Sequence, residues 1–200
     1  MSLSIRQESR KMIQKILDNL VDKQIISREE EDVYQYGIEC LVLKMVHYIS
    51  YAIIALCVRD IWTLVLFLIV FGYLRKNAGG FHAKTRCACY IFSCMVVGMF
   101  LMVCQIEIPR SVIAILMLIA DIIVWAYAPV SSGNMELDEE EQLHYRKKSR
   151  WILFVWNILY ILCLALHADY CAQIIAEACA VEACVLMIAV AQNNIFSKLL

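Results

Sequence analysis

The sequence predicts an all-α integral membrane protein with about six transmembrane helices, the second of them short, preceded by an amphipathic N-terminal helix. Apolar residues make up 62% of the 200 positions and charged residues only 18%, whereas soluble chains average about 45–50% and 25%. The stretches 41–74, 87–128 and 151–191 cover 117 positions but contain only 9 of the 37 charged side chains. Long apolar stretches with polar connections between them are typical of chains that cross a bilayer several times.

The first 40 residues are predicted to form a helical segment in the cytoplasm or at the membrane interface. They carry 14 charges and no uninterrupted apolar core, so we expect them to be retained rather than cleaved as a signal peptide. Apolar residues recur every three or four positions from Ile5 to Val21, which predicts an amphipathic helix. Its apolar face either lies on an anionic membrane surface or packs against the protein. Ser27 followed by Glu30 has the form of a capping box that begins a second helix.

Six apolar segments are predicted to cross the membrane, at 41–58, 61–74, 87–108, 111–128, 151–167 and 171–191. Residues 41–191 then make up the membrane domain, and 192–200 form a cytoplasmic tail. Segment 61–74 would give a helix of only about 21 Å, against a hydrocarbon core of about 30 Å, so it either tilts little or turns back before crossing. Glu177 and Glu182 make the last span the least secure prediction.

The distribution of Lys and Arg predicts the orientation. If the N-terminus is cytoplasmic, 15 of the 18 basic residues lie on the cytoplasmic side, 2 lie outside, and Lys44 lies within the first span. The two outside residues are Arg59 and Arg110. Basic residues concentrate in cytoplasmic loops of membrane proteins, so both termini are predicted to be cytoplasmic.

The 75–86 connection contains the residues best suited to catalysis. Gly79 and Gly80 permit a sharp turn, and His82 follows them in a polar segment beside an apolar wall. A Cys thiolate is a strong nucleophile, and a neighbouring imidazole can take the thiol proton. On one straight helix His82 and Cys89 would lie about 10 Å apart along the axis, so His82 has to fold back from a non-helical segment to reach the thiol.

Nearby charges fit the same interpretation, because Lys84 and Arg86 lower the cost of forming a thiolate. Cys87 and Cys89 point in nearly opposite directions on a helix, so only one of them can face His82, and the spacing alone does not choose. A solvated loop histidine without a catalytic role is the competing interpretation.

Two further possibilities concern a metal site and a third catalytic residue. Asp121, within the fourth span, either orients His82 or pairs with another polar group in the bundle. A metal site is disfavoured because its candidate ligands lack the paired Cys-x-x-Cys spacing of closed zinc sites, so we predict no metal or organic cofactor. Those candidate ligands are His82, Cys87, Cys89 and Cys94.

Several motifs together resemble one known family. The run from Arg75 to Cys89 contains Gly-Gly-x-His-Ala and a cysteine seven residues after the histidine. Tyr36-Gly37-Ile38-Glu39 precedes the first span, and Tyr127-Ala128-Pro129-Val130 begins the second long connection. These segments, in this order and over nearly the whole chain, resemble the AgrB family of accessory gene regulator B membrane peptidases, which act in bacterial peptide quorum sensing.

The resemblance implies roles for individual residues. It makes Cys89 the nucleophile and His82 its base, and it selects Cys89 over Cys87. Arg75 and Gly80 match two further positions of the family motif. It implies that Arg75 orients substrate or supports the loop, and that Gly80 supplies the turn.

The resemblance also implies an activity. A membrane-embedded cysteine endopeptidase would cleave the C-terminal part of an AgrD-like signal-peptide precursor. Through an acyl-enzyme thioester it would then cyclise the peptide to a thiolactone or lactone autoinducer. The implied location is the bacterial cell membrane and the implied assembly a homodimer. A net charge of −1 gives no indication of nucleic-acid binding. Two basic clusters could receive an acidic precursor tail, although membrane topology alone also accounts for them: Arg75, Lys76, Lys84 and Arg86, and Arg146, Lys147, Lys148 and Arg150.

A second class of function stays open from the sequence. A small polytopic transporter or peptide-export component would also contain buried charges within its spans, and His82 and Cys89 would then be incidental. Transporters often show internal repeats and interrupted helices. We find no repeat, and the short second span is the only feature in favour.

Overall fold

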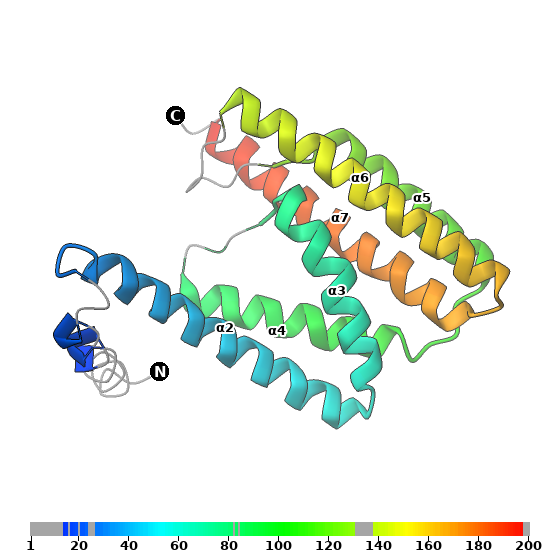
Figure 1. Ribbon diagram of the computed structural model, residues 1–200. Helices are drawn as coiled ribbons and strands as arrows, with labels where there is room; N and C mark the ends of the chain where they lie inside the picture. The colour runs from blue at the N-terminus through cyan, green and yellow to red at the C-terminus, as the bar shows by residue number, and fades with distance from the viewer. Residues whose placement is uncertain are drawn as a thin grey trace. The chain divides into compact units, whose positions relative to one another are not determined.

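The computed structural model describes residues 14–15, 17–19, 21–23, 27–81, 83, 85–130 and 138–197, with side chains up to 193. Within these residues the regular structure is helical, and six helices are long and apolar enough to cross a membrane, which confirms the predicted fold class. The helices are shown in Figure 1 and are α2 (Glu31–Val58), α3 (Ile61–Ala78), α4 (Arg86–Val103), α5 (Arg110–Tyr127), α6 (Glu139–Ala165) and α7 (Asp169–Ser197).

The chain divides into two compact units, of which the first is Met1–Ser50. In this unit the side chain of Leu17 is fully buried against Val21 and Ile38. Packing within the unit therefore accounts for this part of the apolar stripe, and residues 1–13 lie outside the described part of the chain. The predicted capping interaction is present, because the Glu30 carboxylate accepts hydrogen bonds from the amide and hydroxyl of Ser27 at 3.1 and 3.0 Å.

The second unit, Tyr51–Leu200, is built around α7. Helices α3, α4, α5 and α6 all contact α7, and α5, α6 and α7 run side by side in Figure 1. Small residues line the buried face of α7, which lets the neighbouring backbones approach closely. They are Ala172, Ala176, Ala178, Cys179 and Ala183.

The expectation that two glutamates make the last span insecure is wrong. Helix α7 is the most buried of the six, and Glu177 and Glu182 are only 5% and 0% exposed. Both side chains face protein rather than lipid, where ionisable groups in membrane proteins are normally placed. The Glu177 carboxylate accepts hydrogen bonds from Cys104 Sγ at 2.9 Å and Gln173 Nε2 at 2.8 Å. The Cys104 thiol is therefore the hydrogen-bond donor in this contact.

Four helices, α2, α3, α6 and α7, extend more than one residue beyond the predicted spans, and two of them, α3 and α6, border the long connections. Helix α3 continues to Ala78 and has 18 residues, about 27 Å of rise, so it is four residues longer than the predicted span 61–74. Its two ends lie at opposite ends of the unit: Asp60 before it bonds Tyr170, and Ala78 at its end bonds Val130. It therefore crosses the bundle and does not turn back. Helix α6 begins at Glu139 rather than at the predicted 151.

One end of the second unit is held by a hydrogen-bond network centred on Asp60. This carboxylate caps α3 by accepting from the Thr63 amide at 3.1 Å. It also accepts from the hydroxyls of Thr63 at 2.7 Å and Tyr170 at 2.5 Å and from Gln105 Nε2 at 3.0 Å. The short connections before α3, α5 and α7 therefore meet at one residue.

We predict that Asp60→Ala lowers the free energy of unfolding by about 1–2 kcal/mol, because a helix cap and its side-chain hydrogen bonds are lost. Thermal unfolding in detergent micelles measures the change. Arg110→Ala is the control, since it removes only an exposed 2.6 Å ion pair with Asp169 and exposed pairs contribute little. Equal melting temperatures for the two variants would contradict a central role for Asp60.

The same network has a pH signature. Burial acts to raise the pKa of Asp60, but the hydrogen bonds from Tyr170, Thr63 and Gln105 outweigh it and hold the pKa below its ordinary value. A lowered carboxyl pKa stabilises the fold above the unfolded value of about 3.9, and the contribution disappears as the pH falls through the folded value. The stability difference between the parent and Asp60→Ala therefore narrows at acidic pH.

Candidate active site

The connection between α3 and α4 begins with two glycines in conformations that other residues rarely adopt. Gly79 has φ 78° and Gly80 has φ 136°, as the predicted sharp turn requires. A Cβ on Gly79 would lie 2.2 Å from the Val130 carbonyl oxygen. The Val130 amide in turn donates to the Ala78 carbonyl at 2.9 Å. The close approach therefore ties the first long connection to the start of the second.

Arg75 supports this turn from the last turn of α3. Its Nη1 donates to the Gly79 carbonyl at 2.8 Å, and its Nη2 donates to the Phe81 carbonyl. A guanidinium near a helix C-terminus is also favoured by the negative end of the helix dipole. A Cβ on Gly80 would lie 1.4 Å from Nη1, so the absence of a side chain at Gly80 makes room for the guanidinium.

Cys89 lies at the beginning of α4. Thr85 caps this helix by accepting from the Ala88 amide at 3.2 Å, and the Cys89 amide donates to the Thr85 carbonyl at 3.0 Å. The amides of the first turn of a helix carry partial positive charge, and the guanidinium of Arg75 adds a positive charge near the Cys89 sulfur. Cys87 is exposed, whereas Cys89 is partly buried.

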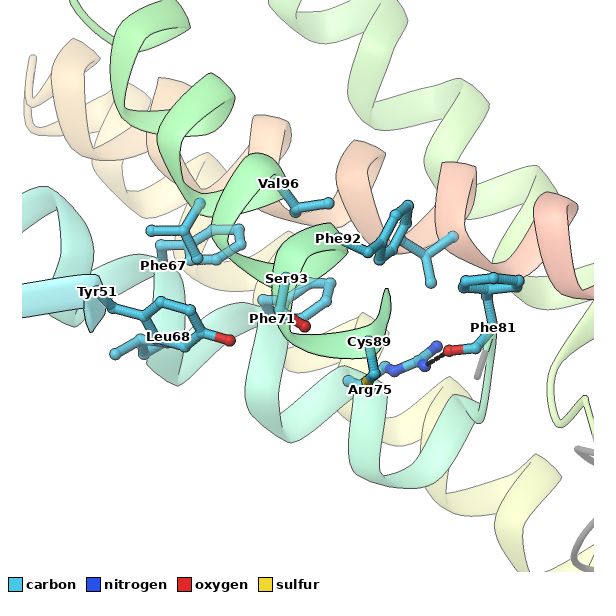
Figure 2. A pocket seen from close by; sticks show the side chains of 12 residues that line it. Tyr51, Phe67, Leu68, Phe71, Arg75, Phe81, Cys89, Phe92, Ser93 and Val96 are labelled. Carbon is cyan, nitrogen blue, oxygen red and sulfur yellow. Dashed lines mark hydrogen bonds between the residues drawn. The ribbon is translucent and has the colours of Figure 1, made fainter. Parts of the chain in front are cut away.

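Cys89 and Arg75 share a cavity of about 190 Å³ in the second unit. They lie side by side as part of its polar lining (Figure 2). The rest of the wall is mainly aromatic and aliphatic, and the rings of Phe81 and Phe92 are 5.1 Å apart. Pockets for whole small molecules measure about 300–1,000 Å³, so this cavity has room for one or two amino-acid side chains. Its other lining residues are Tyr51, Phe67, Leu68, Phe71, Ser93, Val96, Val97 and Val185.

His82 and Lys84 lie outside the described residues. A contact between His82 and Cys89 therefore stays a prediction. Phe81, the residue before His82 in the sequence, lines the cavity together with Cys89. Among the residues that the structure describes, no three His, Cys, Asp or Glu side chains converge as metal ligands.

Asp121 has a partner within the bundle. Its Oδ1 accepts a hydrogen bond from Asn157 Nδ2 at 2.9 Å, so one of the two roles considered for Asp121, pairing with a polar group, is present. Neither Asn157 nor its spacing in α6 had been singled out from the sequence.

The cavity wall and the surroundings of Glu182 were not predicted from the sequence. A partial signal for the wall was present, since Cys89, Phe92 and Val96 follow one another at three- and four-residue spacing and share a face of α4. From the sequence, Glu182 could be recognised only as a charged residue within a span, and its neighbours could not be predicted. In the structure its carboxyl group is fully buried and has no hydrogen-bond partner among the described residues.

Comparison with known proteins identifies the family. The profile of the family described as Accessory gene regulator B, AgrB, matches residues 9–190. The chain belongs to the AgrB family. Two Clostridium perfringens proteins whose names describe them as AgrB-like agree with this assignment. The protein of strain SM101 is 25% identical over 165 residues, covering 76% of this chain and 77% of the relative. The protein of strain 13 is 23% identical over 165 residues, covering 78% and 77%. No solved structure matches the chain.

AgrB membership confirms the resemblance seen in the motifs. The helices able to cross a membrane and the AgrB assignment together indicate a multi-pass membrane protein. Membership also connects the chain with the processing of agr quorum-sensing peptides.

We predict that Gly80→Ala displaces the Arg75 guanidinium, because the new methyl group would overlap Nη1 and the φ of 136° is unfavourable for alanine. The expected results are a lower melting temperature and a changed rate of Cys89 alkylation. Peptide mass spectrometry measures the alkylation rate. Gly72→Ala is the matched control on the same helix, because nothing lies within 4 Å of a Cβ there. We expect it to keep the parent rate and to stabilise α3 by up to about 1 kcal/mol. Equal behaviour of the two variants would contradict the close approach at Gly80.

Proposed function

We propose that this AgrB-family protein is a membrane-embedded cysteine endopeptidase with Cys89 as nucleophile and His82 as general base. The observation that carries the proposal is the shared position of Cys89 and Arg75 on one small apolar cavity, beside the connection that contains His82. Cys87 is exposed and does not line the cavity. A partly buried thiol beside a guanidinium and at a helix N-terminus has the surroundings of a reactive cysteine.

The proposed reaction consists of two acyl transfers. His82 takes the proton of the Cys89 thiol, and the thiolate attacks a peptide carbonyl of an AgrD-like precursor. The C–N bond breaks, the leaving amine takes the proton from His82, and a thioester joins the peptide to Cys89. A Cys or Ser of the same peptide then attacks the thioester and closes a thiolactone or lactone. That step returns the thiol of Cys89.

The cavity suits the residue next to the cleaved bond. Its mainly aromatic wall would take an apolar side chain, and filling it would displace water from the neighbourhood of Cys89. Exclusion of water protects an acyl intermediate from hydrolysis, which cyclisation requires. The small volume fits a peptide that inserts a single side chain and leaves its remainder outside.

Exposed basic residues near the same connections are proposed to receive an acidic precursor tail. Arg75 is not available for this purpose, because its guanidinium already bonds two carbonyls. Arg150 stacks on Trp125 at 4.1 Å and is only partly exposed. The exposed basic side chains among the described residues of this region are Lys76, Arg86, Arg146, Lys147 and Lys148.

The orientation is part of the proposal. The Gly79–Val130 bridge joins the beginnings of the two long connections, next to the basic residues at the neighbouring ends of α3, α4 and α6. Asp60, Gln105 and Tyr170 meet at the other end of the second unit. The excess of Lys and Arg near the first end favours a cytoplasmic location for it. We propose that both termini are cytoplasmic and that the protein acts as a homodimer.

We predict that Cys89→Ala abolishes precursor cleavage, whereas Cys87→Ala retains it within about threefold because that thiol lies away from the cavity. The matched pair is tested in vesicles that contain the purified protein and its precursor, with products identified by mass spectrometry. His82→Ala is expected to reduce cleavage by about 10²–10⁴-fold, the usual contribution of a general base. Equal cleavage by both cysteine variants would reject the peptidase and favour an export function.

A second test concerns the acyl intermediate. A precursor whose internal Cys or Ser is replaced by Ala cannot close a ring, so the thioester on Cys89 is expected to accumulate. Intact-protein mass spectrometry would show an added N-terminal precursor fragment that hydroxylamine removes and that Cys89→Ala lacks. Release of a linear peptide without a detectable adduct would indicate hydrolysis rather than acyl transfer.

A further inference from the structure

Glu182 is a buried charge that the proposed chemistry has not used. Its side chain is 0% exposed, and neither carboxylate oxygen has a hydrogen-bond partner among the described residues. Burying a carboxylate without compensation is costly, and removal of one member of a buried charge pair leaves the other uncompensated. A favourable interaction is therefore expected to hold this residue in α7.

Arg75 supplies the compensating charge. Nη1 of Arg75 lies 1.4 Å from the position of a Cβ on Gly80, and the positive charge of Arg75 is near enough to act on the Glu182 carboxyl group and the Cys89 sulfur. Val185, one turn after Glu182, lines the same cavity and lies 3.3 Å from the position of a Cβ on Gly80. This region of α7 thus adjoins the place where the guanidinium contacts the turn.

We propose that Glu182 is a positioning residue that holds the Arg75 guanidinium in place between the carbonyls of the α3–α4 connection and Cys89. This inference rests on the proposed function of the same site. In a low-dielectric interior an uncompensated guanidinium is drawn toward water, whereas a nearby carboxylate offsets its charge. Loss of that carboxylate would release Arg75 from Gly79 and Phe81 and remove a positive charge from the neighbourhood of Cys89.

The decisive measurement is the alkylation rate of Cys89 at fixed neutral pH, quantified by peptide mass spectrometry. Glu182→Gln keeps the side-chain volume but removes the charge. If Glu182 positions Arg75, alkylation of Cys89 slows by about threefold to tenfold, because a thiolate is less favoured without the guanidinium. If Glu182 acts only as a negative charge near the thiol, its removal favours the thiolate and alkylation becomes faster. A faster or unchanged rate would overturn the inference.

A double-variant comparison separates positioning from general stability. Arg75→Gln alone is expected to slow alkylation, and Glu182→Gln added to it is expected to cause no further change, because its effect passes through Arg75. Additive slowing would overturn the inference. Glu182→Asp retains the charge, so its Cys89 alkylation rate is expected to stay within about twofold of the parent rate. This variant provides the test should Glu182→Gln fail to fold. A rate for Glu182→Asp as low as that of Arg75→Gln would count against the inference.

Glu177→Gln is the matched control. Glu177 is the other buried glutamate of α7, but its two carboxylate oxygens accept separate bonds from Cys104 and Gln173. A glutamine there removes the charge and keeps one oxygen that accepts from one of these donors. The Cys89 alkylation rate of this control should equal that of the parent, and an equal slowing in both variants would overturn the inference.

Precursor cleavage gives a separate readout. We expect Glu182→Gln to reduce it about tenfold or more, since small misplacements at an active site have effects of this size. Because alkylation needs no precursor, its outcome tests the inference even if Cys89→Ala shows the protease assignment to be wrong.

Discussion

The bidentate contact of Arg75 with the carbonyls of Gly79 and Phe81 is the interaction on which the rest of the candidate site depends. It satisfies acceptors just beyond the end of α3, where helix geometry leaves carbonyls without partners. It requires Gly80 to lack a side chain, and it directs the chain back toward the beginning of α4. The same guanidinium places a positive charge beside Cys89, so one side chain determines both the course of the connection and the surroundings of the thiol.

Because that guanidinium is buried beside α7, the residues of α7 have to pack against it or compensate its charge. A helix at the centre of the bundle has neighbours on every side, so its small residues allow close packing and its few polar residues need protein partners. The two buried glutamates of α7, Glu177 and Glu182, have different surroundings. The first is satisfied by neutral donors near one end of the unit, whereas the second is buried without a hydrogen-bond partner among the described residues, and we propose that it acts on Arg75.

The sequence predicted the features that depend on local physics. Apolar stretches defined the helices, Ser27 and Glu30 defined a cap, and the two glycines defined a turn. It could not predict that α3 extends through Arg75, because a charge at a span boundary is typical of a loop as well as of a helix whose guanidinium is used internally. The central place of α7 and the cavity depend on contacts between distant helices, which periodicity within one segment does not reveal. His82 was predicted from its place in the loop between two glycines and Cys89, and it lies outside the described residues.

The bridge between Gly79 and Val130 has a consequence for sequence divergence. From Arg75 to Gly80 and from Tyr127 to Val130 the chain is held in register by hydrogen bonds and by a carbonyl that leaves no room for a Cβ. An insertion or deletion within either stretch would pull apart the two chain segments that meet at this bridge. Natural length variation in the second connection should therefore accumulate after Val130, while the spacing between arginine and the second glycine stays constant among relatives.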